Sequence, residues 1–107
     1  MPNSYKNAKL DLTSTNATVL YTAPGATTSL VKSILVSEDT GNADTITVTI
    51  TDASAAVFSL FKVKAVGANT TVELLTEPLV VQENEILTLT AATANRLHVV
   101  ASLLEIN

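Results

Sequence analysis

The stretch 44-DTITVTITD-52 decides the fold class of this chain. Threonine fills every second position, and the positions between are Ile46, Val48 and Ile50. Because side chains along a β-strand point to opposite faces in turn, this period of two predicts a strand with one apolar face and one hydroxyl face. We expect Ile46, Val48 and Ile50 to face a hydrophobic core.

The composition of all 107 residues agrees with that strand. Threonine occurs 17 times, and valine and isoleucine together occur 17 times, against 3 Gly and 3 Pro. β-branched side chains lose rotamer freedom in a helix and pack well on a pleated surface. The chain is therefore expected to consist of sheet, and its 47% hydrophobic residues are enough to form one core without cross-links.

Outward from 44–52, alternating or apolar runs bounded by turn residues predict the remaining strands. These runs are 10–13, 18–22, 29–37, 56–66, 70–75, 79–82, 86–91 and 96–106. For residues 53–61 an Ala-rich helix is an alternative. The alternation from Val57 to Ala65 favours a strand there.

Two connections between these strands have a predicted geometry. Residues 38–43 collect turn formers, so we expect 29–37 and 44–52 to pair as a hairpin. In 23-APGA-26 the proline fixes φ at the first central position and the glycine accepts a positive φ at the second. That combination predicts a type II turn.

Eight or nine strands spaced roughly 10–12 residues apart are typical of a sandwich or barrel. We predict an all-β fold, an eight- or nine-stranded antiparallel β-sandwich that is either jelly-roll-like or immunoglobulin-like. Residues 9–107 are expected to form this single domain. Residues 1–8 are expected to be a flexible N-terminal arm.

Two predicted strands are apolar on both faces, 29–37 and 96–106. Strict alternation places Leu30, Ile34 and Val36 on one face of the strand 29–37. A two-layer sandwich of this size has one interior, so the extra apolar face needs a curled sheet, an oligomer or a host protein to cover it. The residues expected at such an interface are Tyr5, Tyr21, Leu30, Ile34, Val36, Val100, Leu104 and Ile106.

No residue set for catalysis or metal binding is apparent. The absence of Cys excludes disulfides, thiolate catalysis and Cys-based zinc sites. The single histidine, His98, has apolar neighbours, and no nucleophile elbow accompanies it. The acidic turns 38–44 and 83–85 offer oxygens but lack the spacing of a calcium loop, so solvated turn acids are the favoured interpretation. We expect no enzyme activity, no metal and no cofactor.

Charge and aromatic content argue against other partner classes. The net charge is -4, and six scattered cations give a weak electrostatic term for nucleic acid or an anionic membrane. No stretch has the length and hydropathy of a membrane span, and no signal peptide is visible. A carbohydrate-binding module normally exposes several aromatic rings, whereas this chain has four, of which Phe58 and Phe61 are expected in the core.

Three runs of this sequence resemble small virion proteins of tailed phages, marine ones in particular. They are 18-TVLYTAPG-25, 28-TSLVKSILV-36 and 45-TITVTI-50, followed by a late apolar strand that contains Glu105. The likeness covers the chain from about residue 9 onward and lies in the order of strands and turns. Members of that group are structural, capsid-associated or tail proteins, and no functional residue carries over from them.

The resemblance implies a non-enzymatic structural protein of a phage virion, assembled in the host cytoplasm. The first expectation is a capsid decoration or cement protein that binds the shell. Its partner would then be the major capsid protein, and its own state a homo-oligomer, with a trimer favoured. The alternative is a neck, tail or baseplate component, and a carbohydrate-binding module at a fibre tip ranks third.

Overall fold

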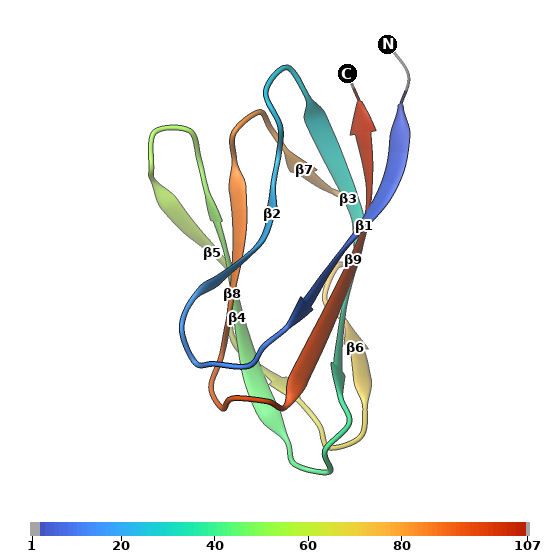
Figure 1. Cartoon of the computed structure of the whole chain (residues 1–107), viewed down its shortest axis with the longest axis vertical. Helices are drawn as coiled ribbons and strands as arrows, with labels where there is room; N and C mark the ends of the chain where they lie inside the picture. The colour runs from blue at the N-terminus through green and yellow to red at the C-terminus, as the bar shows by residue number, and fades with distance from the viewer. Residues whose placement is uncertain (1–2, 107) are drawn as a thin grey trace.

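The structure, a computed structural model, describes residues 3–106. Within them nine strands form two antiparallel sheets, and no helix is present (Figure 1). The strands are β1 (Ser4–Asp11), β2 (Thr18–Thr22), β3 (Thr28–Glu38), β4 (Asp44–Thr51), β5 (Val57–Val66), β6 (Thr71–Glu73), β7 (Leu79–Val81), β8 (Ile86–Ala91) and β9 (Leu97–Ile106). The all-β prediction is confirmed, and residues 53–61 contain no helix.

The first strand of the chain pairs with the last, the second with the one before the last, and so on inward. This pairing makes the sandwich a jelly roll. β1 pairs with β9, β2 with β8, β3 with β6 and β7, and β4 with β5. The resulting double ribbon folds over so that β9 also bonds β3 and β8 also bonds β4. The β9 sheet has the order β1-β9-β3-β6, with β7 also on β3, and the β8 sheet has the order β2-β8-β4-β5. Two packed sheets with these strand orders and connections form the jelly-roll arrangement.

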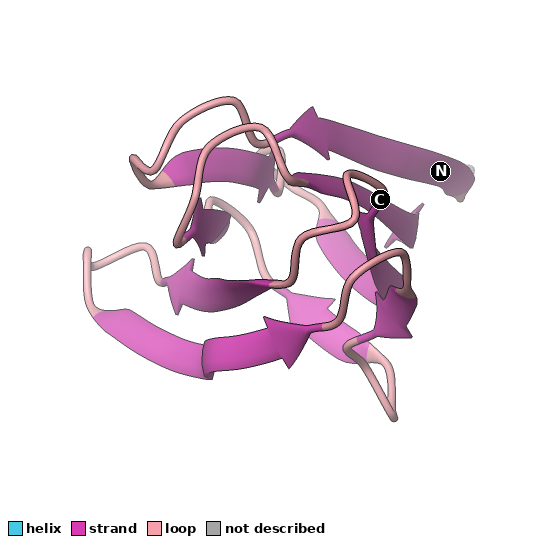
Figure 2. Cartoon of the chain, turned by 90° about the horizontal axis from the view of Figure 1, so that it is seen from below, coloured by secondary structure: helices cyan, strands magenta, loops and turns pink. Residues whose placement is uncertain are grey.

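The core lies between the two sheets, which Figure 2 shows as two layers in a view along the long axis. Ile46 and Val48 are fully buried and Ile50 is half-buried, so the predicted inward face of β4 is confirmed. The other buried apolar residues are Leu12, Leu20, Ala23, Val31, Ile34, Val36, Val66, Leu74, Val81, Leu87, Leu89, Ala91, Leu97, Val99, Ala101 and Leu103. An aliphatic core of this kind is stabilised by area and packing rather than by specific polar contacts.

The predicted flexible arm over residues 1–8 is corrected in the part that the structure describes. Residues 4–8 belong to β1, and Ser4 to Asp11 pair in order with Glu105 to His98 of β9. Met1 and Pro2 lie outside the described residues. The run looks like an arm in the sequence because it is polar and its pairing partner is at the opposite end of the chain.

The predicted hairpin between 29–37 and 44–52 is wrong. β3 and β4 lie in different sheets, so residues 39–43 cross from one layer to the other. The buried Glu38 organises this crossing with its carboxylate. It accepts N–H groups from Thr40 at 2.8 Å, Gly41 at 3.1 Å, Asn42 at 3.2 Å and Asn69 at 3.0 Å. Gly41 has a φ of 85°, a conformation that favours glycine.

The turn at 23–26 also differs from its prediction. The positive φ, 57°, belongs to Ala26 and not to the preceding glycine, so the turn is not type II. The Ala26 N–H donates to the Glu83 carboxylate. This contact with a turn far away in the sequence selects a conformation that the local tetrapeptide does not indicate.

The burial of Val48 predicts that Val48→Asp unfolds the protein, because an unpaired buried charge costs several kcal/mol. Thr47 alternates with it, is only half-buried and accepts the Val63 N–H through Oγ1 at 3.0 Å. An aspartate at position 47 can also accept that N–H, so Thr47→Asp should cost about 1 kcal/mol or less. Urea unfolding followed by circular dichroism measures both variants, and equal, small losses would contradict the assignment of the two faces.

The environment of Glu38 predicts acid sensitivity of the fold. Burial alone would raise the pKa of Glu38, but the Thr40 hydroxyl and the surrounding N–H donors outweigh burial and lower the pKa to about 2. The unfolded chain therefore binds the proton more readily, so this stabilisation is present above about pH 4.5 and is lost as pH falls toward 2. Glu38→Gln should lower the melting temperature at pH 7 and flatten its decline between pH 4.5 and 2.

The matched control for this acid titration is Glu77→Gln, at an exposed carboxylate that accepts no hydrogen bond from residues 3–106. It should leave the decline of the melting temperature unchanged. An equally steep decline in Glu38→Gln would show that the Glu38 cluster does not control acid unfolding.

Candidate functional site

The outer side of the β9 sheet is a broad surface that no other segment of residues 3–106 covers. Along β9, buried residues and outward-facing residues alternate without interruption. Its buried positions are Leu97, Val99, Ala101, Leu103 and Glu105, and its outward positions are His98, Val100, Ser102, Leu104 and Ile106. The predicted outward position of Val100, Leu104 and Ile106 agrees with this pattern, and the outward row is predominantly apolar.

A β-bulge in β3 changes which of its residues reach this surface. Val31 pairs with Leu103 and Ser33 pairs with Ser102, so Lys32 is an extra residue without a partner on β9. One extra residue exchanges the two faces of the strand beyond it. Strict alternation, on which the sequence prediction relied, therefore holds only up to the bulge.

The bulge corrects two of the predicted interface residues. Ile34 and Val36 are fully buried in the core, whereas Leu30 is half-buried and points outward. Leu35, which the prediction placed on the opposite face from Leu30, shares the outer side with it. Nothing in the sequence marks the bulge, because Lys32 fits an ordinary strand equally well.

Pairing across the strands arranges the outward residues in rows. The first row is apolar and crosses four strands, Tyr5 of β1, Leu104 of β9, Leu30 of β3 and Val80 of β7. The next is polar, with Asn7, Ser102 and Ser33. The third is mixed, with Lys9, Val100, Leu35 and Glu73. The last is polar, with Asp11, His98, Ser37 and Thr71.

We define the outer patch as the apolar members of these rows together with Ile106. The patch consists of Tyr5, Leu30, Leu35, Val80, Val100, Leu104 and Ile106. Tyr5 is 76% exposed, Val80 50% and Ile106 41%, so large apolar side chains face solvent together. The predicted residues Tyr5, Leu30, Val100, Leu104 and Ile106 lie in one patch, whereas Leu35 and Val80 were missed because their place depends on strand register.

Tyr21 does not belong to the outer patch, so its predicted interface role stays a prediction. It lies on β2 in the other sheet and is half-buried. Its hydroxyl donates to Glu105 Oε2 at 2.6 Å and lies 2.6 Å from Ser29 Oγ. Burial, and next the hydrogen bond to the Glu105 carboxylate, raise the pKa of Tyr21 to about 12. The residue is a polar link between the two sheets.

The buried Glu105 receives a second donor from β1. Lys6 Nζ lies 2.9 Å from Glu105 Oε1. The hydrogen bonds from Tyr21 and Lys6 lower the pKa of Glu105, against the opposing effect of burial. The carboxylate is thus charged and satisfied, and it fixes β1 and β2 to the end of β9.

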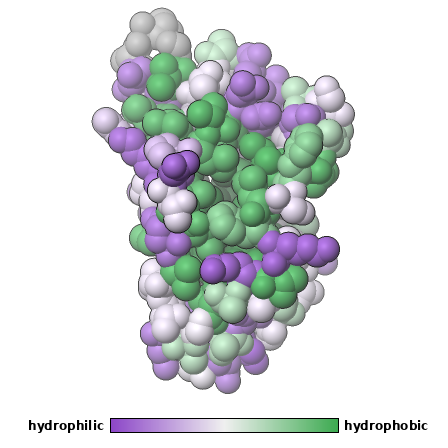
Figure 3. Space-filling model, turned by 180° about the vertical axis from the view of Figure 1, so that it is seen from behind, coloured by the Kyte–Doolittle hydropathy of each residue, from purple (hydrophilic) through white to green (hydrophobic). Residues whose placement is uncertain are grey.

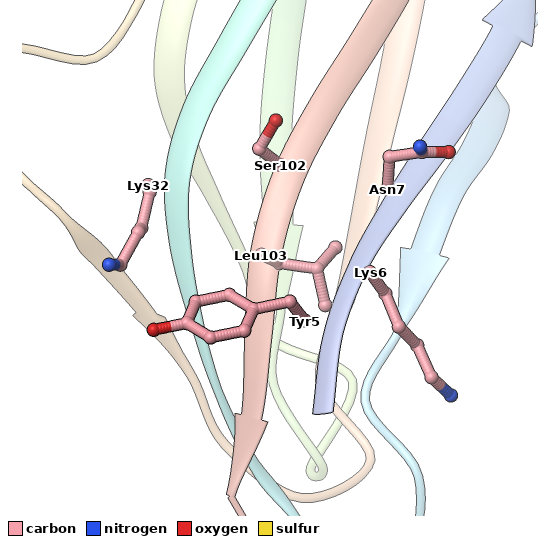
Figure 4. A pocket seen from close by; sticks show the side chains of 6 residues that line it. All are labelled: Tyr5, Lys6, Asn7, Lys32, Ser102 and Leu103. Atoms are coloured by element: carbon pink, nitrogen blue, oxygen red, sulfur yellow. The ribbon is translucent and has the colours of Figure 1, made fainter. Parts of the chain in front are cut away.

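A shallow hollow of about 310 Å³ opens on the outer side next to the Lys32 bulge (Figure 4). It is lined by Tyr5, Lys6, Asn7, Lys32, Ser102 and Leu103. Lys32 Nζ lies 5.5 Å from the centre of the Tyr5 ring, a cation–π arrangement. The hollow adjoins the apolar row on one side and the polar row on the other, so it lies within the candidate docking surface.

In the described part of the chain the histidine lies beside two exposed carboxylates, and other acidic residues of the turns lie apart from it. His98 is exposed, with Nε2 3.4 Å from Asp11 and Nδ1 3.8 Å from Asp39. Within residues 3–106 no group of three or more His, Asp or Glu side chains is placed to hold a metal ion. The turn acids bind backbone instead, as when Asp44 accepts the Thr93 N–H at 3.1 Å and Glu85 accepts the Gln82 N–H at 2.7 Å.

A second set of exposed apolar residues lies on the edge strand β5. Val57, Phe58 and Val63 are more than half exposed, so the prediction of a core position is wrong for Phe58, while Phe61 packs partly buried against the core. Figure 3, seen from behind, shows apolar side chains along the middle of the molecule with hydrophilic ones beside them. Apolar exposure is therefore not confined to the outer patch.

No protein-family model matches this chain, and no curated protein matches it either. The structure of residues 3–106 contains no helix that is long and apolar enough to cross a membrane.

The link between the sheets predicts that Tyr21→Phe destabilises the protein. It removes the hydroxyl that donates to the buried Glu105 carboxylate, and a hydrogen bond to a charged group is worth about 1.5 kcal/mol or more. The matched control is Tyr5→Phe, which removes an exposed hydroxyl and should change the free energy of unfolding by less than about 0.5 kcal/mol. Urea unfolding at pH 7 measures both, and similar values for the two variants would show that the link carries no stability.

Proposed function

We propose that this chain is a non-enzymatic structural protein of a phage virion, a capsid decoration protein that docks on the shell through the outer patch. The observation that carries the proposal is the outer patch, seven apolar side chains that lie beside polar rows on the outer face of the β9 sheet and outside the core. Exposed apolar patches of this kind mark protein–protein contact sites. The resemblance of the strand and turn order to small virion proteins selects the phage particle as the setting.

The size of the face fits an interface. The strands β1, β9 and β3, with the short β6 and β7 in the fourth position, lie about 4.8 Å apart, and the longer ones rise about 3.3 Å per residue, so the face spans at most roughly 20 by 30 Å, or about 600 Å². A stable interface buries about 800 Å² on each partner. The outer face with its rim is of that order, so a single docked partner is sufficient to cover it.

The jelly roll agrees with this role but does not select it. The same arrangement occurs in viral capsid domains and in lectins, and a fold alone never fixes a function. Of the two, carbohydrate binding is supported here by a single exposed tyrosine, Tyr5, on the face in question. Docking by area is supported by seven apolar residues from four strands.

The binding partners of the chain are part of the same proposal. The shell offers the major capsid protein as the docking partner, and decoration proteins repeat with the symmetry of the shell. A homo-oligomer, with a trimer favoured, suits such a lattice. The runner-up is a neck, tail or baseplate component, which uses the same kind of contact at a different site.

The experiment that tests this proposal is a count of copies in purified virions of the phage that encodes the chain. Quantitative mass spectrometry gives the copy number, and electron cryomicroscopy locates the jelly roll. We expect hundreds of copies on the outside of the shell. Six or twelve copies would instead identify a neck or tail component. Complete absence from the particle would overturn the virion assignment.

A further inference from the structure

The hollow beside the Lys32 bulge has an excess of hydrogen-bond donors. Lys32 of β3 and Asn7 of β1 line it on opposite sides, and Ser102 lies between them on β9 (Figure 4). None of these three side chains has a hydrogen-bond or ion-pair partner among residues 3–106, apart from the Tyr5 ring over which Lys32 lies. The carboxylates of Glu105 and Glu73 are already engaged, the first by Lys6 and Tyr21 and the second by Ser33 and Ile34, the residues that follow Lys32 in β3.

Covering this surface with a purely apolar partner would be unfavourable. Docking on the outer patch removes water from Lys32, which lies against the apolar row of Tyr5 and Leu30. A buried ammonium without a counter-charge costs several kcal/mol. Lys9 adds a second positive charge in the mixed row, next to Val100, without a carboxylate partner in the described chain. The partner surface must therefore bring negative charge as well as apolar area.

We propose that the docked partner inserts a carboxylate side chain, from Asp or Glu, into the hollow between Tyr5, Asn7 and Lys32. This inference rests on the proposed function and specifies the chemistry of the docking partner. The carboxylate accepts from Lys32 Nζ and from the Ser102 hydroxyl, while apolar atoms of the partner cover the row beside it. A charge-assisted hydrogen bond is about twice as strong as a neutral one, and apolar contacts around it exclude water.

A second copy of this chain fits the hollow less well than a different protein does. A copy that meets it face to face brings the same donors to the contact. The carboxylates that this face offers are Asp11, which lies 3.4 Å from His98, and Glu73, which is held by the backbone of β3 at Ile34. The charge pattern therefore favours an acidic surface on another protein, the shell protein of the proposed function.

The test uses particles assembled by a phage from which the gene for this chain has been deleted. Purified full-length chain is added back, and its dissociation constant is measured by co-sedimentation at two salt concentrations. Lys32→Gln should bind at least about 10-fold more weakly and with less salt dependence, and Lys32→Glu should bind more weakly still. Lys62→Glu, an exposed lysine on β5 of the other sheet, is the matched charge control and should bind like the wild type. Thermal melts check that each variant is folded.

Val100→Asp separates failure of this inference from failure of the proposed function. Val100 is exposed on the patch and lies outside the hollow, so its loss of binding reports docking through this face alone. If wild type binds, Val100→Asp does not, and Lys32→Gln binds as tightly as wild type, the carboxylate contact is overturned and the docking face stands. If wild type does not bind the particles, the proposed function is overturned. Reversible dimers of free chain that Lys32→Glu abolishes would identify a second copy as the occupant and overturn the inference.

Discussion

A single extra residue in β3 determines which side chains this protein presents to its surroundings. Because Lys32 has no partner on β9, Leu30 before it and Leu35 after it both face outward. Val31 and Ile34 both remain in the core for the same reason. Without the bulge, one half of the strand would place its core residues in water and its surface residues in the core. The outward positions of Leu30 and Leu35 and the position of the Lys32 ammonium near the Tyr5 ring therefore have one common cause.

Carboxylates complete the structure where the ladder hydrogen bonds stop. Glu73 accepts the Ile34 N–H at 2.8 Å just after the bulge, Glu38 holds the loop that crosses between the sheets, and Glu105 joins both sheets through Tyr21. Hydrogen bonds to each of the three outweigh burial and lower its pKa, so all three stay charged at neutral pH. Their donors are already supplied by the fold. The perturbed acids of this protein thus have a structural explanation, and the outer patch is the feature that the fold itself does not explain.

Local periodicity predicted the strands well because alternation depends only on neighbouring residues. The predicted strands 18–22 and 86–91 agree with β2 and β8 at both ends. The predictions that were wrong concern features that depend on residues far away in the sequence. The inward position of Ile34 follows from register with β9, and the two-layer crossing after β3 from donors collected around Glu38. Tyr21 looked like an exposed aromatic because its hydrogen-bond partner, Glu105, lies at the other end of the sequence.

The exposed apolar residues of β5 and those of the outer patch differ in how the fold treats them. On β5, Lys62 and Lys64 flank Val63, whose φ of 53° interrupts the ladder, and the Val63 N–H is taken by Thr47. A charged and bulged edge of this kind prevents a strand from pairing with another chain. The outer patch lies on the face of hydrogen-bonded strands, and its rows continue across them without such a device. Protection of the β5 edge and openness of the β9 face are therefore in keeping with the proposed docking through side-chain packing on the β9 sheet.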